Sequence, residues 1–209
     1  DRGSVHTSQR AKAVDAIIYA SRAAGTGIRG VVPDAWPMDR FEQSFVLHMV
    51  TMAGLLGHPR LADVLAPQLE DMRAALTSQG LGFSDFFAPD GDDTAAAVAA
   101  IAAAGLTVDS GALNPFIRAD RFVAYPFESH GSYTVTARAA HAMHIIGQSA
   151  ADWQPFILKS QQPDGWWTSD KWNRSRLYGT CVALSALGID AHESRSAAAE
   201  AFLRYQHSD

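Results

Sequence analysis

The sequence predicts an all-α protein, and three observations favour this fold class. Alanine is the most frequent residue, with 37 copies among 209 residues, and it is the strongest helix former. The alanines cluster beside Leu, Ile and Met at helical spacing instead of alternating with polar residues. Strand signals are sparse, and only 133–136 has the composition of a strand. We therefore expect about eight helices joined by short loops, with no linker that divides the chain into domains.

The first three helices are predicted from apolar periodicity and from the residues that end them. Apolar residues recur at helical spacing over 8–24, and a Gly/Pro-rich loop over 25–37 follows. The next helix spans 38–56 and has a broad apolar face. A third spans 60–78, and Pro67 is expected to kink or split it because proline lacks a backbone N–H.

The fourth predicted helix, 92–105, begins with acidic residues, runs through consecutive alanines and ends at a glycine. Acidic side chains complement the helix dipole at an N-terminus, which supports this start. Shorter helical stretches follow, and we expect them over 111–117, 131–146, 152–161, 176–187 and 193–206.

One short pattern recurs along the chain. Residues 157–164 and 202–209 both read apolar-Leu-basic-x-Gln-x-x-Asp, and 76–83 is a fainter third copy. Helical hairpins repeated every ~40–50 residues stack as a solenoid or close into an α/α barrel, and the pattern alone leaves both open. The middle copy continues into Gly-Trp-Trp, whereas the last copy stops at Asp209. We therefore expect this chain to be cut from a longer one.

Composition narrows the classes of function. The formal charge of −5 disfavours a nucleic-acid surface, and the lone Cys181 excludes an internal disulfide framework and a thiolate metal cluster. The longest nearly unbroken apolar run, 95–106, is too short to span a membrane, and no stretch resembles a signal peptide. We expect a globular protein of the cytoplasm.

The acidic motif Asp90-Gly91-Asp92-Asp93 admits two interpretations. Asp is a favoured N-cap, so the carboxylates could simply begin a helix. Alternatively, three neighbouring carboxyl groups titrate as a coupled set and retain a proton, with Asp92 as its natural holder. A buried carboxylic acid among aromatic rings suits protonation of a carbon–carbon double bond, because the rings stabilise the resulting carbocation. The candidate rings are Trp36, Phe83, Phe86, Phe87, Trp166, Trp167, Trp172 and Tyr178.

Other chemistry-bearing residues give weaker signals. His141 and His144 are three residues apart on a predicted helix, but no carboxylate at matching spacing completes a metal site, so we expect them in the core or at the surface. We predict no metal site formed by this chain. The sequence also has no Gly-x-Ser-x-Gly nucleophile motif and no phosphate-cradling glycine-rich loop.

Four motifs, in this order, resemble those of class II diterpene cyclases. Residues 90–95, Asp-Gly-Asp-Asp-Thr-Ala, resemble the Asp-x-Asp-Asp-Thr-Ala motif of class II terpene cyclases, and 161–166 is similar to their Gln–Trp turns. Residues 36–42 resemble the aromatic-Pro-x-Asp-x-Phe-Glu segment of copalyl diphosphate synthases, and 170–172 match the Asp-Lys-Trp of that branch. Squalene-hopene cyclases typically share only the acid and the Gln–Trp turns. The chain is therefore identified as resembling bacterial enzymes of the copalyl diphosphate synthase type.

This resemblance implies an all-α, α/α-barrel fold over residues 1–209, corresponding to the β domain of a two-domain βγ protein. The γ domain would be absent, and the C-terminus would be clipped. The resemblance also implies that the active-site cavity lies between the two domains. The γ domain would contribute an acidic segment that binds Mg2+ and diphosphate.

The implied reaction is a cyclisation of geranylgeranyl diphosphate without loss of its diphosphate. By carry-over, Asp92 is the general acid, and Asp90 and Asp93 polarise and position it. The resemblance implies a copalyl-type product, and for a source in specialised metabolism we expect ent-copalyl diphosphate. The expected substrate-binding residues are Trp36, Phe87, Trp166, Lys171, Trp172 and Tyr178.

Two positions depart from the pattern of bacterial relatives. Those relatives carry an Asn that orients the acid, within Ser-x-Ser-x-Asn-x-His, and here Thr136 occupies that place. A hydroxyl can still donate one hydrogen bond, so Thr136 is a candidate for orienting Asp92. The common Asp-Lys-Trp-His reads Asp-Lys-Trp-Asn here, with Asn173 last. No base that terminates the reaction is assigned.

Three alternatives remain. One is another class II terpene cyclase, of drimenyl, halimadienyl or hopene type, acting on farnesyl diphosphate or squalene in some cases. A second is a non-catalytic helical scaffold, for which Asp92 would be an exposed, ordinarily ionised cap. A third, a barrel resembling the protein prenyltransferase β subunit, needs an Asp/Cys/His zinc set that the single cysteine does not support.

Overall fold

The computed structural model describes residues 2–24, 38–168, 170–171, 173–187 and 191–206. Within them the chain is helical, with isolated bridges between single residue pairs in place of strands. The α-helices are α1 (Arg2–Ala24), α2 (Asp39–Met52), α3 (Ala62–Ala75), α4 (Gly91–Ala103), α5 (Tyr133–Ile145), α6 (Gln154–Lys159), α7 (Arg176–Ala186) and α8 (His192–Gln206). Three 3-10 helices join them: η1 (Pro59–Leu61), η2 (Ser110–Phe116) and η3 (Ala151–Trp153).

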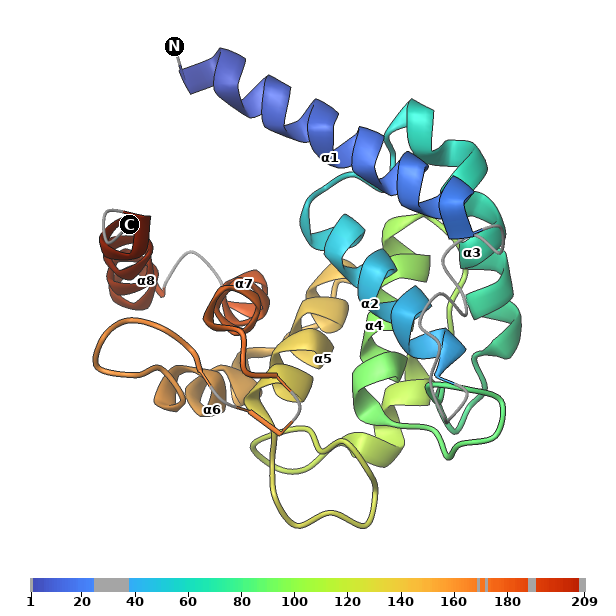
Figure 1. Ribbon diagram of the computed structural model, residues 1–209. Coiled ribbons are helices and arrows are strands. Elements are labelled where there is room, and N and C mark those ends of the chain that lie inside the picture. Colours follow the sequence, from blue (N-terminus) through green and yellow to red (C-terminus); the bar gives the residue numbers. More distant parts are fainter. Residues whose placement is uncertain (1, 25–37, 169, 172, 188–190, 207–209) are drawn as a thin grey trace.

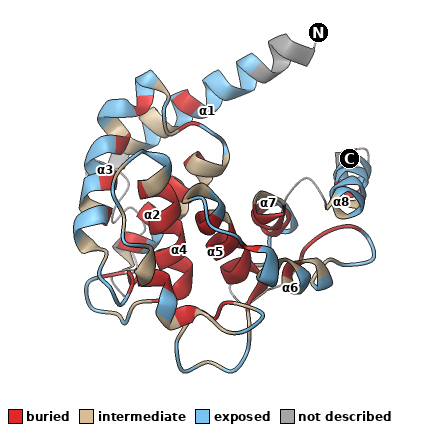
Figure 2. Ribbon diagram, turned by 180° about the vertical axis from the view of Figure 1, so that it is seen from behind, coloured by how far each residue is buried: buried red, intermediate tan, exposed pale blue. Residues whose placement is uncertain are grey.

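Inner and outer helices alternate along the chain. The inner helices α2, α4, α5 and α7 form a row in which each contacts the next, and they carry most of the buried residues (Figure 2). On the outside, α3 packs against α2 and α4, η2 against α4, and α6 against α5. This alternation is that of an α/α toroid, so the predicted all-α fold class is confirmed.

Alanine explains how α4 and α5 come so close. Both helices are lined by fully buried alanines, which are Ala95, Ala96, Ala97, Ala99 and Ala100 on α4 and Ala137, Ala139, Ala140 and Ala142 on α5. Small side chains allow two helices to approach closely while the larger residues at their edges fill the core. The two helices lie side by side in Figure 1, and they make the most extensive contact between elements.

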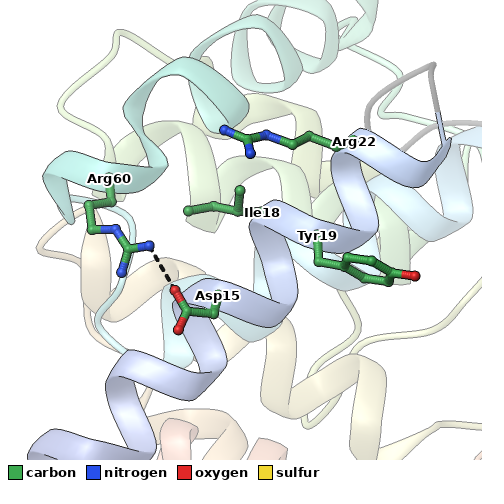
Figure 3. A pocket seen from close by; sticks show the side chains of 5 residues that line it. All are labelled: Asp15, Ile18, Tyr19, Arg22 and Arg60. Carbon is green, nitrogen blue, oxygen red and sulfur yellow. Dashed lines mark hydrogen bonds and ion pairs between the residues drawn. The ribbon is translucent and has the colours of Figure 1, made fainter.

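The first helix is peripheral. Most of α1 is exposed, and its Asp15 carboxylate pairs with Arg60 of η1 at 2.7 Å (Figure 3). Asp15 and Arg60 are both more than half exposed, so this ion pair is expected to contribute little to stability. A shallow pocket there is lined by Asp15, Ile18, Tyr19, Arg22 and Arg60.

No described helix is long and apolar enough to cross a membrane.

Most predicted helices are found, and the differences have local causes. Pro67 does not split its helix, since α3 runs unbroken to Ala75, whereas Pro59–Leu61 forms a separate 3-10 turn. The second helix ends at Met52 instead of 56, because Gly54 adopts a φ of 63° that ends the helix.

Segment 111–117 is a 3-10 helix with Pro115 inside it, and 152–161 divides into η3 and α6. The strand-like residues 133–136 form the first turn of α5. The predicted loop 25–37 lies outside the described residues.

The fold predicts that Gly91 tolerates no side chain. A Cβ there would lie 2.4 Å from the carbonyl oxygen of Val123 and 3.1 Å from Val135 Cγ1. We expect Gly91→Ala to lower the free energy of unfolding by about 1–3 kcal/mol, although alanine is normally the better helix residue. Gly57→Ala is the matched control, since nothing lies within 4 Å of its Cβ position. Urea denaturation measures both, and equal midpoints would contradict the expectation.

Candidate active site

The site lies where the inner helices begin. Asp90 is the N-cap of α4, and its Oδ1 accepts hydrogen bonds from the backbone N–H of Asp92 at 3.0 Å and Asp93 at 2.8 Å. The predicted capping role is therefore present. The same turn buries all three carboxyl groups, with exposed fractions of 5%, 8% and 2% for Asp90, Asp92 and Asp93. Capping and burial thus occur together in this motif.

Each of the three carboxyl groups has a different partner. Asp90 is held by the backbone of its own helix, and the Ser44 hydroxyl of α2 donates to Asp93. Arg138 of α5 forms an ion pair with Asp92, with Nη1 3.0 Å from Oδ1. This contact is an ion pair without a hydrogen bond, because neither Asp92 Oδ1 nor Arg138 Nη1 has a hydrogen-bond partner. The three partners come from α4, α2 and α5, so the motif is completed only by the packed helices.

Burial raises the pKa of all three carboxyl groups. The pKa of Asp90 lies well above its ordinary value because of burial and the neighbouring charge of Asp93. Burial raises the pKa of Asp93 to about 6, against the hydrogen bond from Ser44. Burial also raises the pKa of Asp92, although the Arg138 charge opposes it. The motif therefore retains protons at a pH where exposed carboxyl groups are ionised. The pKa rises well above its ordinary value at Asp90 and not at Asp92, the expected holder of the proton, because the Arg138 charge opposes the rise there.

The carboxyl groups open onto a cavity of about 270 Å³. Its lining is largely apolar and consists of Met38, Phe41, Phe83, Asp90, Asp92, Asp93, Ala124 and Tyr125. Three aromatic rings thus share the cavity with the acids. Such a cavity can present a buried carboxylic acid to a hydrocarbon and stabilise a positive charge that develops on it.

The predicted aromatic residues divide between the site and the core. Phe87 packs at a tilt against the cavity residue Phe83, with ring centroids 4.2 Å apart. Tyr178 lies beneath Arg138, whose Cζ is 5.4 Å from the ring centroid. Trp166 packs against Tyr205 of α8 and does not line the cavity, and Trp167 is buried with its Nε1 donating to the Ile157 carbonyl. Phe86 is exposed. The predicted residues Trp36 and Trp172 lie outside the described residues.

Thr136 is hydrogen-bonded to backbone. Its Oγ1 accepts from Phe122 N at 3.0 Å and donates to the Ser132 carbonyl at 2.7 Å. Two other inner helices repeat this contact, since Leu81 N donates to Thr94 Oγ1 and Trp167 N donates to Thr180 Oγ1. Thr136 therefore links Phe122, in the segment before α5, to α5 itself. The side chain of α5 that contacts Asp92 is Arg138.

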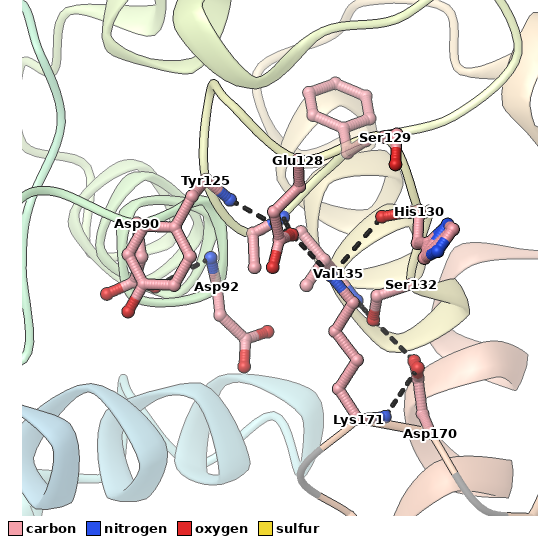
Figure 4. A network of polar contacts seen from close by, with 12 residues as sticks. Asp90, Asp92, Tyr125, Glu128, Ser129, His130, Ser132, Val135, Asp170 and Lys171 are labelled. Carbon is pink, nitrogen blue, oxygen red and sulfur yellow. Dashed lines mark hydrogen bonds and ion pairs between the residues drawn. The ribbon is translucent and has the colours of Figure 1, made fainter.

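Lys171 faces a glutamate. Its Nζ pairs with Glu128 and donates to the His130 carbonyl at 3.3 Å, while its backbone N–H donates to Asp170 Oδ1 at 2.8 Å (Figure 4). Asp170 in turn accepts from the Thr134 backbone and hydroxyl at the start of α5. Asp170 and Lys171 are therefore joined to α5 and to the loop beside the cavity.

The histidines are not arranged as a metal site. His144 is exposed, whereas His141 faces the fully buried His48, with ring centroids 5.6 Å apart. Burial lowers the pKa of His141 to about 4 and that of His48 well below its ordinary value. Within the described part of the chain, no group of three or more His, Cys, Asp or Glu side chains could hold a metal ion. The acidic motif does not fit Mg2+, because the Arg138 guanidinium lies 3.0 Å from Asp92 and would repel a divalent cation there.

Sequence reasoning missed Arg138, Ser44, Phe41 and Tyr125. Arg138 carried a signal, because it is a lone charged residue in an otherwise small and apolar helical stretch. Such a residue needs a buried partner of opposite charge. Phe41 lay within the recognised segment 36–42, but nothing there marked it as a cavity residue. Ser44 and Tyr125 carried no signal, since only the packing of α2 and of the loop before α5 against α4 brings them to the motif.

The Asp92–Arg138 pair predicts non-additive losses of stability. Asp92→Asn leaves a guanidinium that is 1% exposed without its counter-charge, which is expected to cost about 3–5 kcal/mol of unfolding free energy. Arg138→Met leaves a buried carboxyl group, whose pKa then rises further because the opposing charge is gone. The double variant should lose clearly less than the sum of the two. Urea denaturation of the four proteins measures this, and strict additivity would show that the pair is not coupled.

Asp93 predicts a pH dependence of stability. Its folded-state pKa of about 6 exceeds the ordinary 3.8, so between these values the folded chain binds more protons than the unfolded chain. The free energy of unfolding should therefore fall as pH rises from about 4 to 6, by on the order of 1–3 kcal/mol from this group. Asp93→Asn should make this fall shallower. Ser44→Ala should make it steeper, because the Ser44 hydrogen bond lowers the Asp93 pKa. A slope unchanged in both variants would contradict the assignment.

Comparison with known proteins places this site in a family. No family model matches the chain. The (+)-kolavenyl diphosphate synthase of Herpetosiphon aurantiacus is 46% identical over 191 residues, which are 91% of this chain and 37% of that protein. The terpentedienyl-diphosphate synthase of Kitasatospora griseola is 31% identical over 78% of this chain and 33% of its own length.

A solved structure agrees with these relatives. The ent-copalyl diphosphate synthase from Streptomyces platensis superposes with a TM-score of 0.71 at 29% identity, over 85% of this chain and 36% of that one. The chain therefore spans between a third and two fifths of the length of these proteins. By sequence, by fold and by the resemblance of its acidic motif, this chain belongs to the class II diterpene cyclase family.

Proposed function

We propose that this chain is the acid-bearing β domain of a class II diterpene cyclase. The observation that carries the proposal is the set of three buried carboxyl groups with raised pKa values that open onto an aromatic cavity. A non-catalytic scaffold requires an exposed and ordinarily ionised Asp92, and the buried Asp92 weighs against it. The whole protein would act on geranylgeranyl diphosphate and form a bicyclic diphosphate of copalyl or kolavenyl type.

The proposed reaction begins at Asp92. Its carboxylic acid donates a proton to the terminal double bond of the substrate, and two carbon–carbon bonds then form in succession. Loss of a proton from the final carbocation ends the reaction, so the product is an isomer of the substrate and keeps its diphosphate. Arg138 stabilises the carboxylate that remains on Asp92, at 3.0 Å. Phe41, Phe83 and Tyr125 present aromatic faces to the positive charge.

Asp92 is the best placed of the three carboxyl groups to act as the acid. Asp90 is held by two backbone N–H groups and Asp93 by Ser44, so both are committed to hydrogen bonds that fix the turn. The partner of Asp92 is a cation, which favours its conjugate base and so strengthens the acid. Asp90 and Asp93 serve to position it.

The remaining components of the active site would come from outside this chain. Half of the cavity and the diphosphate site would belong to a γ domain, and Mg2+ would accompany the diphosphate there. Mg2+ is bound in proteins through carboxylates and substrate phosphates, which fits such a site. We propose ent-copalyl diphosphate as the specific product. Phe87 and Tyr178 are proposed to shape the substrate side of the cavity through Phe83 and Arg138, which they contact. Trp36 and Trp172 are proposed as further substrate-binding residues.

The test uses the full-length protein, incubated with geranylgeranyl diphosphate and Mg2+, followed by removal of phosphate and mass spectrometry of the alcohols. We expect a bicyclic alcohol that Asp92→Asn reduces at least about 100-fold, the usual range for loss of a general acid. Circular dichroism verifies that the variant is folded. Asp109→Asn is the matched control, because Asp109 caps η2 through Gly111 N and lies outside the cavity.

The other outcomes discriminate among the alternatives. A bicyclic alcohol that persists in folded Asp92→Asn would remove Asp92 as the acid. Unchanged geranylgeraniol from the wild type would direct the assay to farnesyl diphosphate and squalene. Inactivity on all three substrates would overturn the cyclase proposal in favour of the scaffold.

A further inference from the structure

The charge of Lys171 is matched inside the protein. Its ammonium group pairs with the Glu128 carboxylate, and the two side chains are only 20% and 21% exposed. A second contact, to the His130 carbonyl at 3.3 Å, holds the same ammonium group. Lys171 is therefore a partly buried cation with two acceptors of its own.

Glu128 joins Lys171 to the loop that forms one wall of the cavity. Besides pairing with Lys171, its Oε2 accepts from the backbone N–H groups of Ala124 at 3.2 Å and Tyr125 at 3.3 Å. Its own backbone N–H donates to the Tyr125 carbonyl at 3.0 Å. One carboxylate thus closes the turn 124–128 and is itself held by a lysine from a segment more than forty residues away.

The other end of this loop is attached to the acidic motif. The Ala124 carbonyl accepts from Gly91 N at 2.8 Å, at the first residue of α4. Ala124 and Tyr125 line the cavity together with the three carboxyl groups, and the Tyr125 side chain lies beside Asp90 in Figure 4. Burial and the charges of Asp90 and Asp93 raise the pKa of Tyr125 to about 12, so it stays a neutral phenol beside the acids.

We propose that Tyr125 is a specificity-determining residue of the cavity wall, and that Glu128 and Lys171 are positioning residues that hold it there. Lys171 then acts through Glu128 and not on the diphosphate of the substrate. This inference rests on the proposed cyclase function. A ring stabilises a nearby cation by an amount that depends on its distance from the charge, so the place of Tyr125 influences which carbocation persists before proton loss. Its position therefore bears on the ratio of products.

The experiment uses the full-length protein and a double-mutant cycle. We expect Lys171→Met and Glu128→Gln each to change the product ratio and to lower kcat about tenfold, with the KM for geranylgeranyl diphosphate within twofold of wild type. Lys171→Met added to Glu128→Gln should have little further effect, because the two act as one unit. Tyr125→Leu should shift the product ratio in the same direction. Asp15→Asn with Arg60→Met, an exposed ion pair of similar type, is the matched control.

A direct measurement separates the two roles of Lys171 without turnover. The affinity for inorganic diphosphate, measured by calorimetry in the presence of Mg2+, should be unchanged within twofold by Lys171→Met. A tenfold loss of affinity, with an additive rise of KM in the Glu128→Gln background, would overturn the proposal and make Lys171 a diphosphate ligand. An unchanged product ratio in Tyr125→Leu would also overturn it. If wild-type protein forms no cyclic product, the proposed function fails, a result distinct from both of these.

Discussion

Burial of three carboxyl groups within four residues constrains most of the structure around α4. An unpaired ionised carboxylate in a protein interior is costly, so each group requires a partner or a proton. The chain meets this requirement in three ways at once, with backbone N–H groups for Asp90, a hydroxyl for Asp93 and a guanidinium for Asp92. The raised pKa values also keep protons on the motif, so part of its negative charge does not form. The motif thus keeps protons because it is buried, and its partners come from three helices.

The α/α arrangement makes this concentration of polar groups possible. Three of the four inner helices, α4, α5 and α7, begin with the N-caps Asp90, Ser132 and Ser175, whose side chains accept hydrogen bonds from backbone N–H groups of the first turn. Three of these helices also use an early threonine to bind the backbone of the segment before them, at Leu81, Phe122 and Trp167. Because the same tie recurs, Thr136 belongs to the architecture of the repeat.

The loops beside the acidic motif join the inner helices to the cavity. The segment 124–128 contacts Gly91 at one side and Lys171 at the other, so Lys171 is linked to the start of α4 through the Glu128 carboxylate and the Ala124 backbone. Trp166 and Trp167 contribute differently, by packing the turn against α8 and α6. The conspicuous tryptophans are therefore structural here, whereas the less conspicuous Phe41, Phe83 and Tyr125 line the cavity.

The sequence by itself determined the helical class, the start of α4 at the acidic motif and the turn after α6, because these depend on local spacing, capping and composition. It also carried the motifs by which the family was predicted. Only the tertiary structure decided that the helices form a toroid, that Arg138 pairs with Asp92, and that Lys171 faces Glu128. These contacts join residues 43 to 49 positions apart in the chain, such as Ser44 with Asp93 and Glu128 with Lys171. Local periodicity cannot encode such pairings, because they arise only when helices pack and exclude water from the groups between them.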